Sequence, residues 1–509
     1  MRLSSWLRSA RSLFVPSGTE KGHRPTRLRK RSMALPLSLE RLEDRTVPST
    51  FTVSNLADSG PGSLRQAVLD ANAHPGADVI RFAHAARDGT IALTGGQLNI
   101  TDNLTIDGPG ADELAVSGND ASRVFQISIG VTASIEDLTV THGHALLRGG
   151  GISNAGTLTL SHAILSENQA VGTPGATVEP DVFGGGIFNS GTLTVRHSTF
   201  IHNQAIGGDG APGAPGRSGL GGAIMSLGSV SAPATATVSH STFLDNQAIG
   251  GAAGAGAPLT RNGLGGAIMN DAGTFTVSHS SFHDNQATGG FGGSGVGGGG
   301  SGGAIANVAR DGNAILSVSN STLADNRAVG GAGGTGGSSQ IGRGGAIASF
   351  IFPFATIPVT ASVTVTRSLL LGNQAIGGAA TGGNGGTGKG GAIAIENGVV
   401  LTVTHSALSG NLAMGGAGSG GSGGNGLGGG IFNGGPSPKG TPSLTLRHSL
   451  VALNRAEGGA AGVGGSVGLG QGGGLYLTAG GVATAHRTAI LANDASTSDD
   501  DVFGALVLI

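Results

Sequence analysis

The chain has 509 residues, of which 100 are Gly, 11% are charged and only 4% are aromatic. So few large apolar side chains exclude a wide globular core, while a mean hydropathy of +0.13 is too high for a disordered chain. The sequence has no Cys, which excludes disulfides and a thiol nucleophile, and its net charge of −2 argues against nucleic-acid binding by the whole chain.

The first segment, residues 1–48, is basic. Residues 1–50 contain 11 Lys and Arg against 4 Asp and Glu, and no apolar stretch in residues 1–48 is long enough for an ordinary signal peptide. We expect these residues to be a disordered export or targeting segment. Its end, Leu39–Pro48, reads LERLEDRTVP and resembles the LExLEDR tag found near the start of exported bacterial surface proteins. The resemblance implies an extracellular or cell-surface location.

Residues 49–148 are predicted to form an N-terminal cap and the first coils of a solenoid. Ser63 and Gln66 have the spacing of a capping box, and apolar residues at helical spacing predict a helix from Leu64 to about Ala73. Such a helix would cover the open end of a solenoid core. The short strands predicted after it are Val79–Phe82, Thr90–Thr94, Leu104–Ile106, Leu114–Val116, Val124–Ile127 and Leu138–Val140.

This part of the chain is similar to the N-terminal cap of bacterial surface β-helix proteins. The similarity lies in Phe51–Asn55 and in Gly62–Ala67. Those proteins often have Cys where this chain has Gly62, so the match is imperfect.

From Gly149 onward the sequence repeats, with two anchors that recur nine times each. The first anchor is Gly-Gly-(Ala/Gly) followed by Ile152, Ile187, Ile224, Ile268, Ile305, Ile347, Ile393, Ile431 or Leu475. The second is an apolar residue followed three positions later by Asn168, Asn203, Asn246, Asn285, Asn326, Asn373, Asn411, Asn454 or Asn493. We number the coils 1 to 9 in this order.

The two anchors resemble the GGAI and FxxN repeats of polymorphic outer membrane proteins. Five copies read GGAI and three read FxxN in full. Those proteins end in a membrane β-barrel, and we expect no such barrel here. The repeats predict an all-β fold: a single-stranded right-handed parallel β-helix (solenoid) with an N-terminal capping helix, in which residues 149–509 form nine coils with Gly-rich inserts.

Coil 2 illustrates the predicted unit. Strands are expected at Gly185–Asn189, Thr192–His197 and Phe200–Ala205, with apolar and polar residues alternating along the second. A Gly-rich segment then leads to the next coil, and the distance from the Asn anchor to the following Ile or Leu is always 19 to 22 residues. This constancy indicates either stacked, ordered segments or recent duplication, and the sequence leaves both open.

Two rows of polar residues are predicted to stack along the helix as structural ladders. One is the row of Asn anchors, whose amides would satisfy backbone groups of the turns. The other is a His about six residues before the anchor, at His162, His197, His240, His279, His405, His448 and His486. A metal-binding role for this row was the alternative, but no Cys or carboxylate lies beside it in the sequence. We expect no cofactor.

A third row directly precedes the Asn anchors and is mainly acidic: Glu167, His202, Asp245, Asp284 and Asp325. We interpret it as a solvated acidic edge. The alternative is a weak Ca²⁺ site at Asp245, Asp284 and Asp325, because stacked carboxylates repel one another unless they are solvated or bridged by a cation.

No catalytic set is evident, since no coil contributes Asp together with Arg or Lys on one face. The sequence therefore predicts an extracellular or cell-surface structural or adhesive protein that is not an enzyme. Phe350, Phe352 and Phe354 are candidates for an exposed contact patch. The alternative is a polysaccharide lyase or hydrolase of the β-helix type. Expected partners are cell-surface polysaccharides or envelope proteins, with no nucleic acid and no transmembrane segment, and we expect a monomer.

Overall fold

The structure is a computed structural model that describes residues 48–177, 180–257, 261–293, 295–334, 337 and 339–509. The LExLEDR-like tag and the rest of residues 1–47 lie outside the described residues. In the described part the chain forms parallel strands with one α-helix, α1 (Leu64–Ala73), and one 3₁₀ turn, η1 (His84–Ala86). None of the helices in this part is long and apolar enough to span a membrane.

The predicted capping helix is present with the expected bounds. The Ser63 hydroxyl accepts a hydrogen bond from the N–H of Gln66, and Leu64 and Val68 are buried against the solenoid core. The surrounding strands are β1 (Thr50–Val53), β2 (Asp78–Phe82), β3 (Gly89–Ala92), β4 (Leu98–Ile100), β5 (Leu104–Asp107), β6 (Leu114–Ser117), β7 (Phe125–Ile127), β8 (Thr132–Glu136) and β9 (Thr139–Thr141). Of these, β1, β4 and β8 were not predicted.

Each coil contains more strands than the sequence indicated. Coil 2 has β16 (Ile187–Asn189), β17 (Thr192–Arg196), β18 (Thr199–Ile201) and β19 (Gln204–Ile206), and β20 (Gly219–Leu220) precedes coil 3. The single strand predicted over Phe200–Ala205 is wrong. It is split by a corner at His202, whose backbone is left-handed (φ 54°), so the chain turns there.

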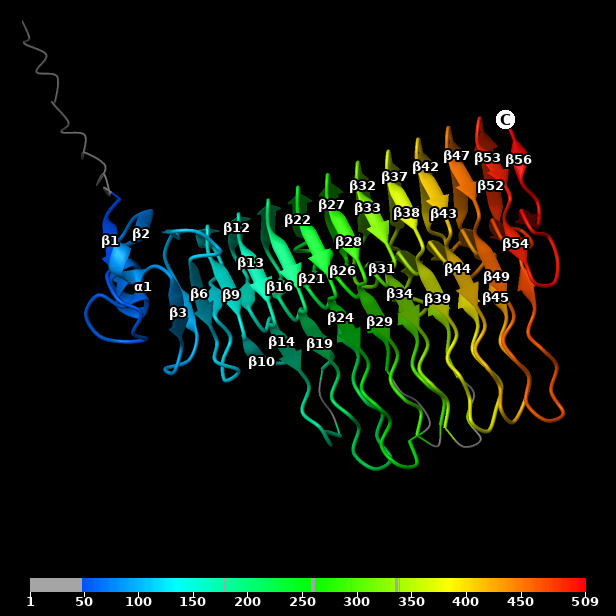
Figure 1. Ribbon diagram of the computed structural model, residues 1–509, viewed down its shortest axis with the longest axis horizontal. Helices are drawn as coiled ribbons and strands as arrows, with labels where there is room; N and C mark the ends of the chain where they lie inside the picture. The colour runs from blue at the N-terminus through cyan, green and yellow to red at the C-terminus, as the bar shows by residue number, and fades with distance from the viewer. Residues whose placement is uncertain (1–47, 178–179, 258–260, 294, 335–336, 338) are drawn as a thin grey trace, which may run out of the picture. The chain divides into compact units, whose positions relative to one another are not determined.

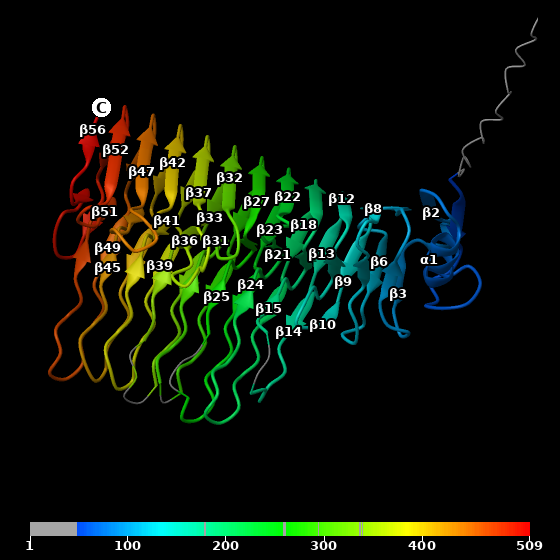
Figure 2. The same cartoon turned by 180° about the vertical axis from the view of Figure 1, so that it is seen from behind.

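The strands stack into five sheets, and all their strand pairs are parallel (Figures 1 and 2). Sheets A, B and D run from β1 to β56 (Val507–Leu508), from β3 to β53 (Ala489–Leu491), and from β10 (His144–Leu146) to β54 (Asp494–Ala495). Sheet C comprises β4, β7, β11 (Ile152–Asn154), β16, β21 (Ile224–Leu227), β26 (Ile268–Asp271), β31 (Ile305–Ala309), β36 (Ile347–Ile351), β41 (Ile393–Glu396), β46 (Ile431–Asn433), β51 (Leu475–Leu477) and β55 (Val502–Phe503).

Sheet E is formed from the ends of the Gly-rich segments. Its strands are β15 (Val182–Phe183), β20, β25 (Gly263–Leu264), β30 (Gly300–Ser301), β35 (Gly342–Arg343), β40 (Gly388–Lys389), β45 (Gly426–Leu427) and β50 (Gly470–Gln471). In every sheet the register places like residues over like, so Ile224 pairs with Ile268 and Ile268 with Ile305. The structure is therefore the parallel β-helix that the repeats predict.

The core is a narrow column of aliphatic and Phe side chains along the helix axis. Phe200, Phe243 and Phe282 stack with ring centroids 4.7 and 4.6 Å apart. One continuous cluster reaches from Val53 in the cap to Ala485 in coil 9. Because each coil adds only a few apolar side chains, stability accumulates over the coils rather than in one place.

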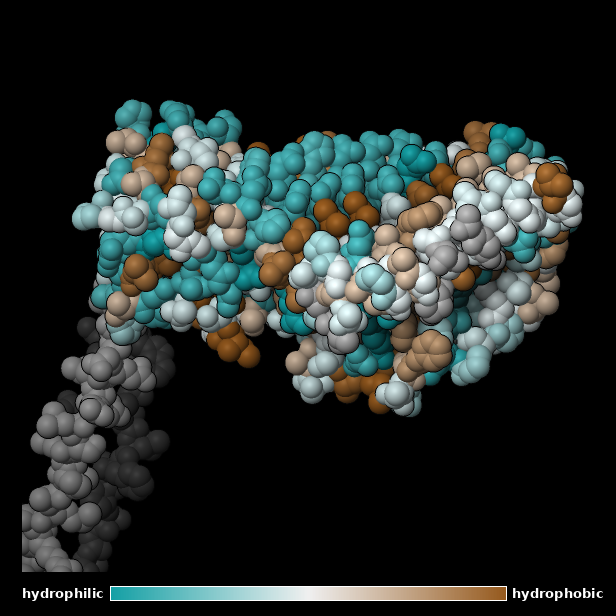
Figure 3. Space-filling model, turned by 90° about the horizontal axis from the view of Figure 1, so that it is seen from below, coloured by the Kyte–Doolittle hydropathy of each residue, from teal (hydrophilic) through white to brown (hydrophobic). Residues whose placement is uncertain are grey.

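In the part of the chain that the structure describes, the Gly-rich segments stack on one another as a ridge. They lie on one side of the helix, below the strands in Figure 1, and they are pale in Figure 3, which views the molecule from that side. Their backbones are hydrogen-bonded between coils, for example from the Gly416 N–H to the Gly386 carbonyl (2.8 Å) and from the Gly459 N–H to the Gly424 carbonyl (2.8 Å). The described residues therefore show the stacked arrangement, which was one of the two explanations for the constant spacing between the anchors.

Candidate functional site

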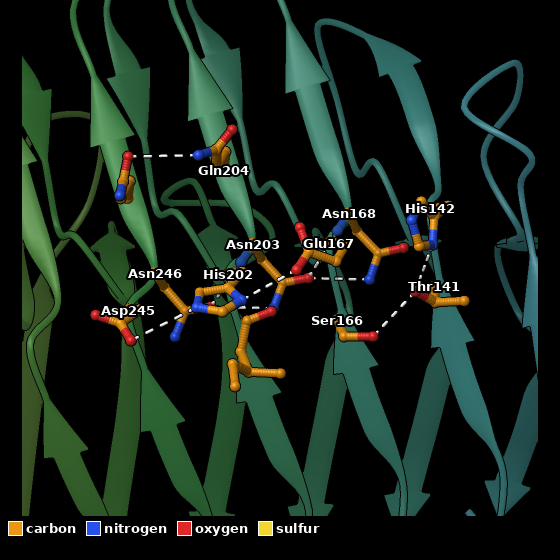
Figure 4. Close-up of polar contacts among 12 residues, drawn as sticks. Thr141, His142, Ser166, Glu167, Asn168, His202, Asn203, Gln204, Asp245 and Asn246 are labelled. Carbon is orange, nitrogen blue, oxygen red and sulfur yellow. Dashed lines mark hydrogen bonds and ion pairs between the residues drawn. The ribbon is translucent and has the colours of Figure 1, made fainter.

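The Asn anchors form an unbroken buried ladder. Each side-chain Nδ2 donates to Oδ1 of the Asn in the next coil at 2.8–3.0 Å, from Asn168 to Asn493 (Figure 4). Asp501 terminates the ladder, because its Oδ1 accepts from both the backbone N–H and Nδ2 of Asn493 (3.1 and 2.8 Å). Every hydrogen bond of this row is used within the fold, so the Asn ladder is structural.

A second ladder lies at the corner between sheets C and A, and the sequence analysis missed it. Asn154 Nδ2 donates to Asn189 Oδ1 (2.7 Å), and Asn270 Nδ2 donates to Asn307 Oδ1 (2.8 Å). Coils 3 and 6 have Ser instead of Asn at this place, which hid the row.

The His rings stack in two groups on the surface. The centroids of His162, His197, His240 and His279 are 4.8–5.1 Å apart, and those of His405 and His448 are 4.8 Å apart. These residues have φ near +50°, a left-handed conformation that Asn, Asp and His adopt more readily than most residues. The turn geometry therefore accounts for the residue type.

Contrary to the prediction, His486 does not belong to this row. The left-handed position in coil 9 is occupied by Arg487 (φ 45°), and the His486 ring contacts His448 edge-on with a centroid distance of 5.3 Å. The prediction was wrong because His486 is the last residue of its strand (Val482–His486), one position before the corner that His occupies in the other coils.

Protonation of His448 is expected to weaken the fold. Partial desolvation within the stack, followed by the nearby imidazoles and Arg side chains, lowers the pKa of His448. Its neutral form is therefore favoured in the folded state, and this contribution to stability is lost as the pH falls through the unfolded pKa of about 6.5. We expect the melting temperature to fall less between pH 7 and pH 5 in His448→Asn than in the native protein, since Asn320 occupies the same position in coil 5. His283→Asn, which is outside the row, is the control, and an equal fall in all three proteins would contradict the prediction.

The acidic row lies next to the Asn ladder on the outside. The His202 ring bridges two carboxylates, with Nδ1 3.0 Å from Glu167 Oε1 and Nε2 3.5 Å from Asp245 Oδ2 (Figure 4). Burial, together with the charges of Asp245 and Asp325, raises the pKa of Asp284. Within the described ranges, no group of three or more His, Asp or Glu side chains is placed to hold a metal ion. The row is half-exposed, and we treat it as a solvated edge.

A different surface concentrates charge beside aromatic rings. We call it the outer stripe: the second and fourth residues of the sheet C strands, with the second residues of the neighbouring sheet E strands. Most of these positions are apolar, and they pack together in clusters outside the main core, as Met225 and Met269 do with Leu220 and Leu264. Charged residues interrupt this pattern in coils 4 to 7, and this part of the stripe is the candidate site.

Asp271, at the end of β26, is the first interruption. Its carboxyl is only 3% exposed, and Oδ2 lies 3.6 Å from Nε of Arg310 in coil 5, while Oδ1 has no hydrogen-bond partner among the described residues. Burial raises the pKa of Asp271, Arg310 lowers it, and the charges of Asp311 and Asp181 raise it; together they bring it to about 6. A carboxyl with a pKa near neutrality is suited to accept or donate a proton.

Aromatic rings adjoin the Arg310 guanidinium. The Arg310 guanidinium lies over the Phe352 ring at 4.8 Å from its centroid, and Phe354 meets Phe352 edge-on at 5.9 Å. Phe350 and Phe352 pack against the outer cluster, whereas Phe354 is 80% exposed. Of the predicted contact patch, only Phe354 is thus fully presented to solvent.

The second interruption is a triad of charges. Glu396 Oε1 lies 2.7 Å from Lys389 Nζ, and Glu396 Oε2 lies 3.0 Å from Arg343 Nε. Burial would raise the pKa of Glu396, but the two cations outweigh it and bring the pKa to about 2, so this carboxylate is ionised at neutral pH. Lys389 Nζ also lies 4.7 Å from the centre of the Phe432 ring.

The expectation that no single coil contributes Asp together with Arg or Lys on one face did not consider pairs that form between coils. Asp271 and Arg310 come from consecutive coils and meet only when β26 and β31 stack in register. A signal was present in the repeat itself: the fourth residue of sheet C is Leu227 in coil 3 and Val308 in coil 5, but Asp271 in coil 4.

No family model and no curated protein matches this chain. Two solved structures are similar to it. The catalytic unit of a thermostable α-1,3-glucanase from Streptomyces thermodiastaticus is 14% identical, with a TM-score of 0.37, over 89% of this chain and 70% of that one. The A-module of the mannuronan C-5 epimerase AlgE6 from Azotobacter vinelandii is 10% identical, with a TM-score of 0.25, over 90% and 99%.

These matches correct one expectation. The sequence analysis predicted that the chain is not an enzyme, yet both solved structures are enzymes. At this degree of similarity the likeness concerns the fold alone and assigns no reaction.

Proposed function

We propose that this protein is a carbohydrate-active β-helix enzyme that cleaves an acidic polysaccharide by elimination, with Asp271 as the proton-transferring group. The single observation that supports this most is the Asp271 carboxyl. It is buried beside Arg310, has a pKa of about 6 and lies where neighbouring coils have apolar residues.

The cation beside Asp271 favours elimination over hydrolysis. A glycosidase uses two carboxyl groups about 5–10 Å apart across the bond, one of them protonated as the general acid. Glu396, the other carboxyl whose pKa is strongly shifted, is ionised and lies three strand steps from Asp271 in the same column, a separation of about 14 Å at about 4.8 Å per step. Elimination instead needs one base and one cation, which Asp271 and Arg310 supply.

In the proposed reaction, ionised Asp271 takes the proton from the carbon next to a sugar carboxylate. Arg310 stabilises the negative charge that develops on that carboxylate. The electron pair then forms a carbon–carbon double bond and expels the glycosidic oxygen, which becomes a hydroxyl by taking the proton back from Asp271, so that Asp271 is ionised again. The products are one unsaturated chain end and one ordinary chain end, and the exposed Phe354 ring offers a surface for the sugar.

The test is incubation of the full chain with polygalacturonate and with alginate, following the ultraviolet absorbance of unsaturated ends and the appearance of reducing ends. We expect unsaturated products, and a rate at least about 100-fold lower for Asp271→Asn. Asp284→Asn, which removes a carboxyl on the acidic row, should keep the native rate. Reducing ends without unsaturation, no product from either polymer, or full activity of Asp271→Asn would refute the proposal.

The same variant makes a prediction about stability that does not depend on substrate. The folded pKa of Asp271, about 6, is above its unfolded value of 3.8, so ionisation of this group destabilises the folded state as the pH rises through that interval. At about 1.4 kcal/mol per unit, Asp271→Asn should be more stable than the native protein at pH 8 by up to roughly 3 kcal/mol, and no more stable at pH 4. Urea unfolding at both pH values measures this, and a gain that does not depend on pH would contradict it.

We also propose that the protein acts at the cell surface or outside the cell. The tag-like residues Leu39–Pro48 and the resemblance of the GGAI and FxxN repeats to those of polymorphic outer membrane proteins support this. Fractionation of cells, with mapping of the N-terminus of the recovered chain, tests the location.

A further inference from the structure

We propose that Arg343, Lys389 and Glu396 form an anion-binding subsite, which holds an acidic group of a polysaccharide at a distance from Asp271. This inference rests on the proposed function for the identity of the polymer. The binding that it describes can be measured without any cleavage.

The repeat supplies its own comparison for these three positions. The column of Arg343 and Lys389 continues, in the other coils, with Leu220, Leu264, Ser301, Leu427 and Gln471. The residue equivalent to Glu396 is Val308 in coil 5 and Phe350 in coil 6. Uncharged side chains therefore fill the same space in the same fold, and packing does not require charge here.

Stability does not explain the triad either. Removing charges from water costs free energy that their attraction often fails to recover, and apolar residues of similar volume are commonly as stable or more so. A chain with only 11% charged residues has nevertheless placed three of them together. We infer that these three residues are charged because they bind an anionic ligand.

The geometry of the triad leaves it able to bind an anion. Arg343 and Lys389 are paired neighbours in sheet E, and both contact the single carboxylate of Glu396, so the triad has a net charge of +1. An Arg and a Lys together have eight N–H donors, more than one carboxylate can accept. The side chains of the two cations are 25% and 19% exposed, so an anion from solvent can reach them.

The position of the triad indicates a polymer rather than a small acid. Glu396 stands in the same column as Asp271, about 14 Å away along the axis at about 4.8 Å per strand. Phe350 and Val308 lie between them in that column. A ligand that occupies both places must be several sugars long and must carry acidic groups on separated residues.

The experiment measures binding of polygalacturonate, dextran sulfate and uncharged dextran to the full chain by calorimetry. The test variant is Arg343→Leu with Lys389→Leu and Glu396→Val. It introduces the residue types found at the equivalent positions Leu264, Leu427 and Val308. Arg81→Leu, a 65% exposed cation on sheet A, removes the same net charge and serves as the control. We expect the triple variant to bind polygalacturonate at least 10-fold more weakly, to melt no lower than the native protein, and the control to bind as the native protein does.

The comparison of polymers identifies the anionic group. Tighter binding of polygalacturonate than of dextran sulfate indicates a carboxylate ligand, and the reverse order indicates a sulfate; either result supports an anion subsite. Native affinity in the triple variant, equal affinity for dextran, or a clear fall in the melting temperature of the triple variant would overturn the proposal. Single-stranded DNA bound more tightly than every polysaccharide would overturn it as well.

The failure of this inference is distinguishable from failure of the proposed function. If the triple variant binds normally but Asp271→Asn abolishes the unsaturated product, the function stands and the subsite does not. If binding is lost in the triple variant but the native protein yields no product, the subsite stands and the reaction does not.

Discussion

Replacing Asn285 by Leu is expected to destabilise the protein strongly. Asn285 Oδ1 accepts from the backbone N–H and from Nδ2 of Asn246 (3.1 and 2.9 Å). Its Nδ2 donates to the Phe243 carbonyl (3.0 Å) and to Asn326 Oδ1 (2.9 Å). Leu cannot make any of these bonds, and water does not reach a residue that is 0% exposed.

Each buried polar group left without a partner costs about 1–3 kcal/mol, so we expect a loss of at least about 3 kcal/mol in the free energy of unfolding. Urea unfolding of the full chain measures it. The neighbouring Gln286 is the matched control: its side chain makes a hydrogen bond to Thr288 Oγ1 (2.7 Å) outside the core, and Gln286→Ala should cost less than about 1 kcal/mol. Similar losses for the two variants would show that the ladder is not an important source of stability.

Replacing Gly424 by Ala is expected to disrupt the Gly-rich ridge. A Cβ at this position would overlap the carbonyl oxygen of Gly386 in the adjacent coil, and the obstacle is backbone that cannot rotate away. The same backbone makes the hydrogen bonds from Gly424 to Gly416 (2.9 Å) and from Gly459 to Gly424 (2.8 Å), so a shift that relieves the overlap also breaks these. We expect a loss of about 3 kcal/mol, at the upper end of the cost of overpacking.

Gly299 offers the matched control because it lies in another Gly-rich segment. A Cβ there would have its nearest contact at 3.4 Å from Asn262 Oδ1, which is ordinary van der Waals contact, so Gly299→Ala should be tolerated. Hydrogen exchange of the ridge amides and the melting temperature distinguish the two variants. If both leave the ridge amides protected, the segments do not depend on Gly for close approach.

The β-helix was predictable because stacking in parallel register makes the position within a repeat equivalent to a position in space. The anchors at Ile268 and Asn285 recur with the same partners, so the column to which each belongs could be read from one coil and extended to the rest. The capping helix was predictable for a local reason, since the Ser63 hydroxyl and the apolar spacing after it act within the same few residues.

The corner at His202 was not predictable from strand patterns. Apolar residues alternate with polar ones on both sides of it, at Phe200 and Ala205, so the sequence looks like one strand. Only the stacked coils show that the chain must turn at His202 so that Asn203 points inward and the next strand joins sheet D. Sheet register, rather than local preference, decides where the strand ends.

The sequence by itself determined the repeat, the solenoid and the row of Asn anchors, because these depend on period and on residue type within one coil. The tertiary structure decided that the Gly-rich segments stack on one another and that Asp271 meets Arg310. Both facts depend on contacts between backbones and side chains of adjacent coils, some forty residues apart in the chain. The pKa of Asp271 has the same origin, since burial and neighbouring charges are properties of the stacked coils and not of any segment alone.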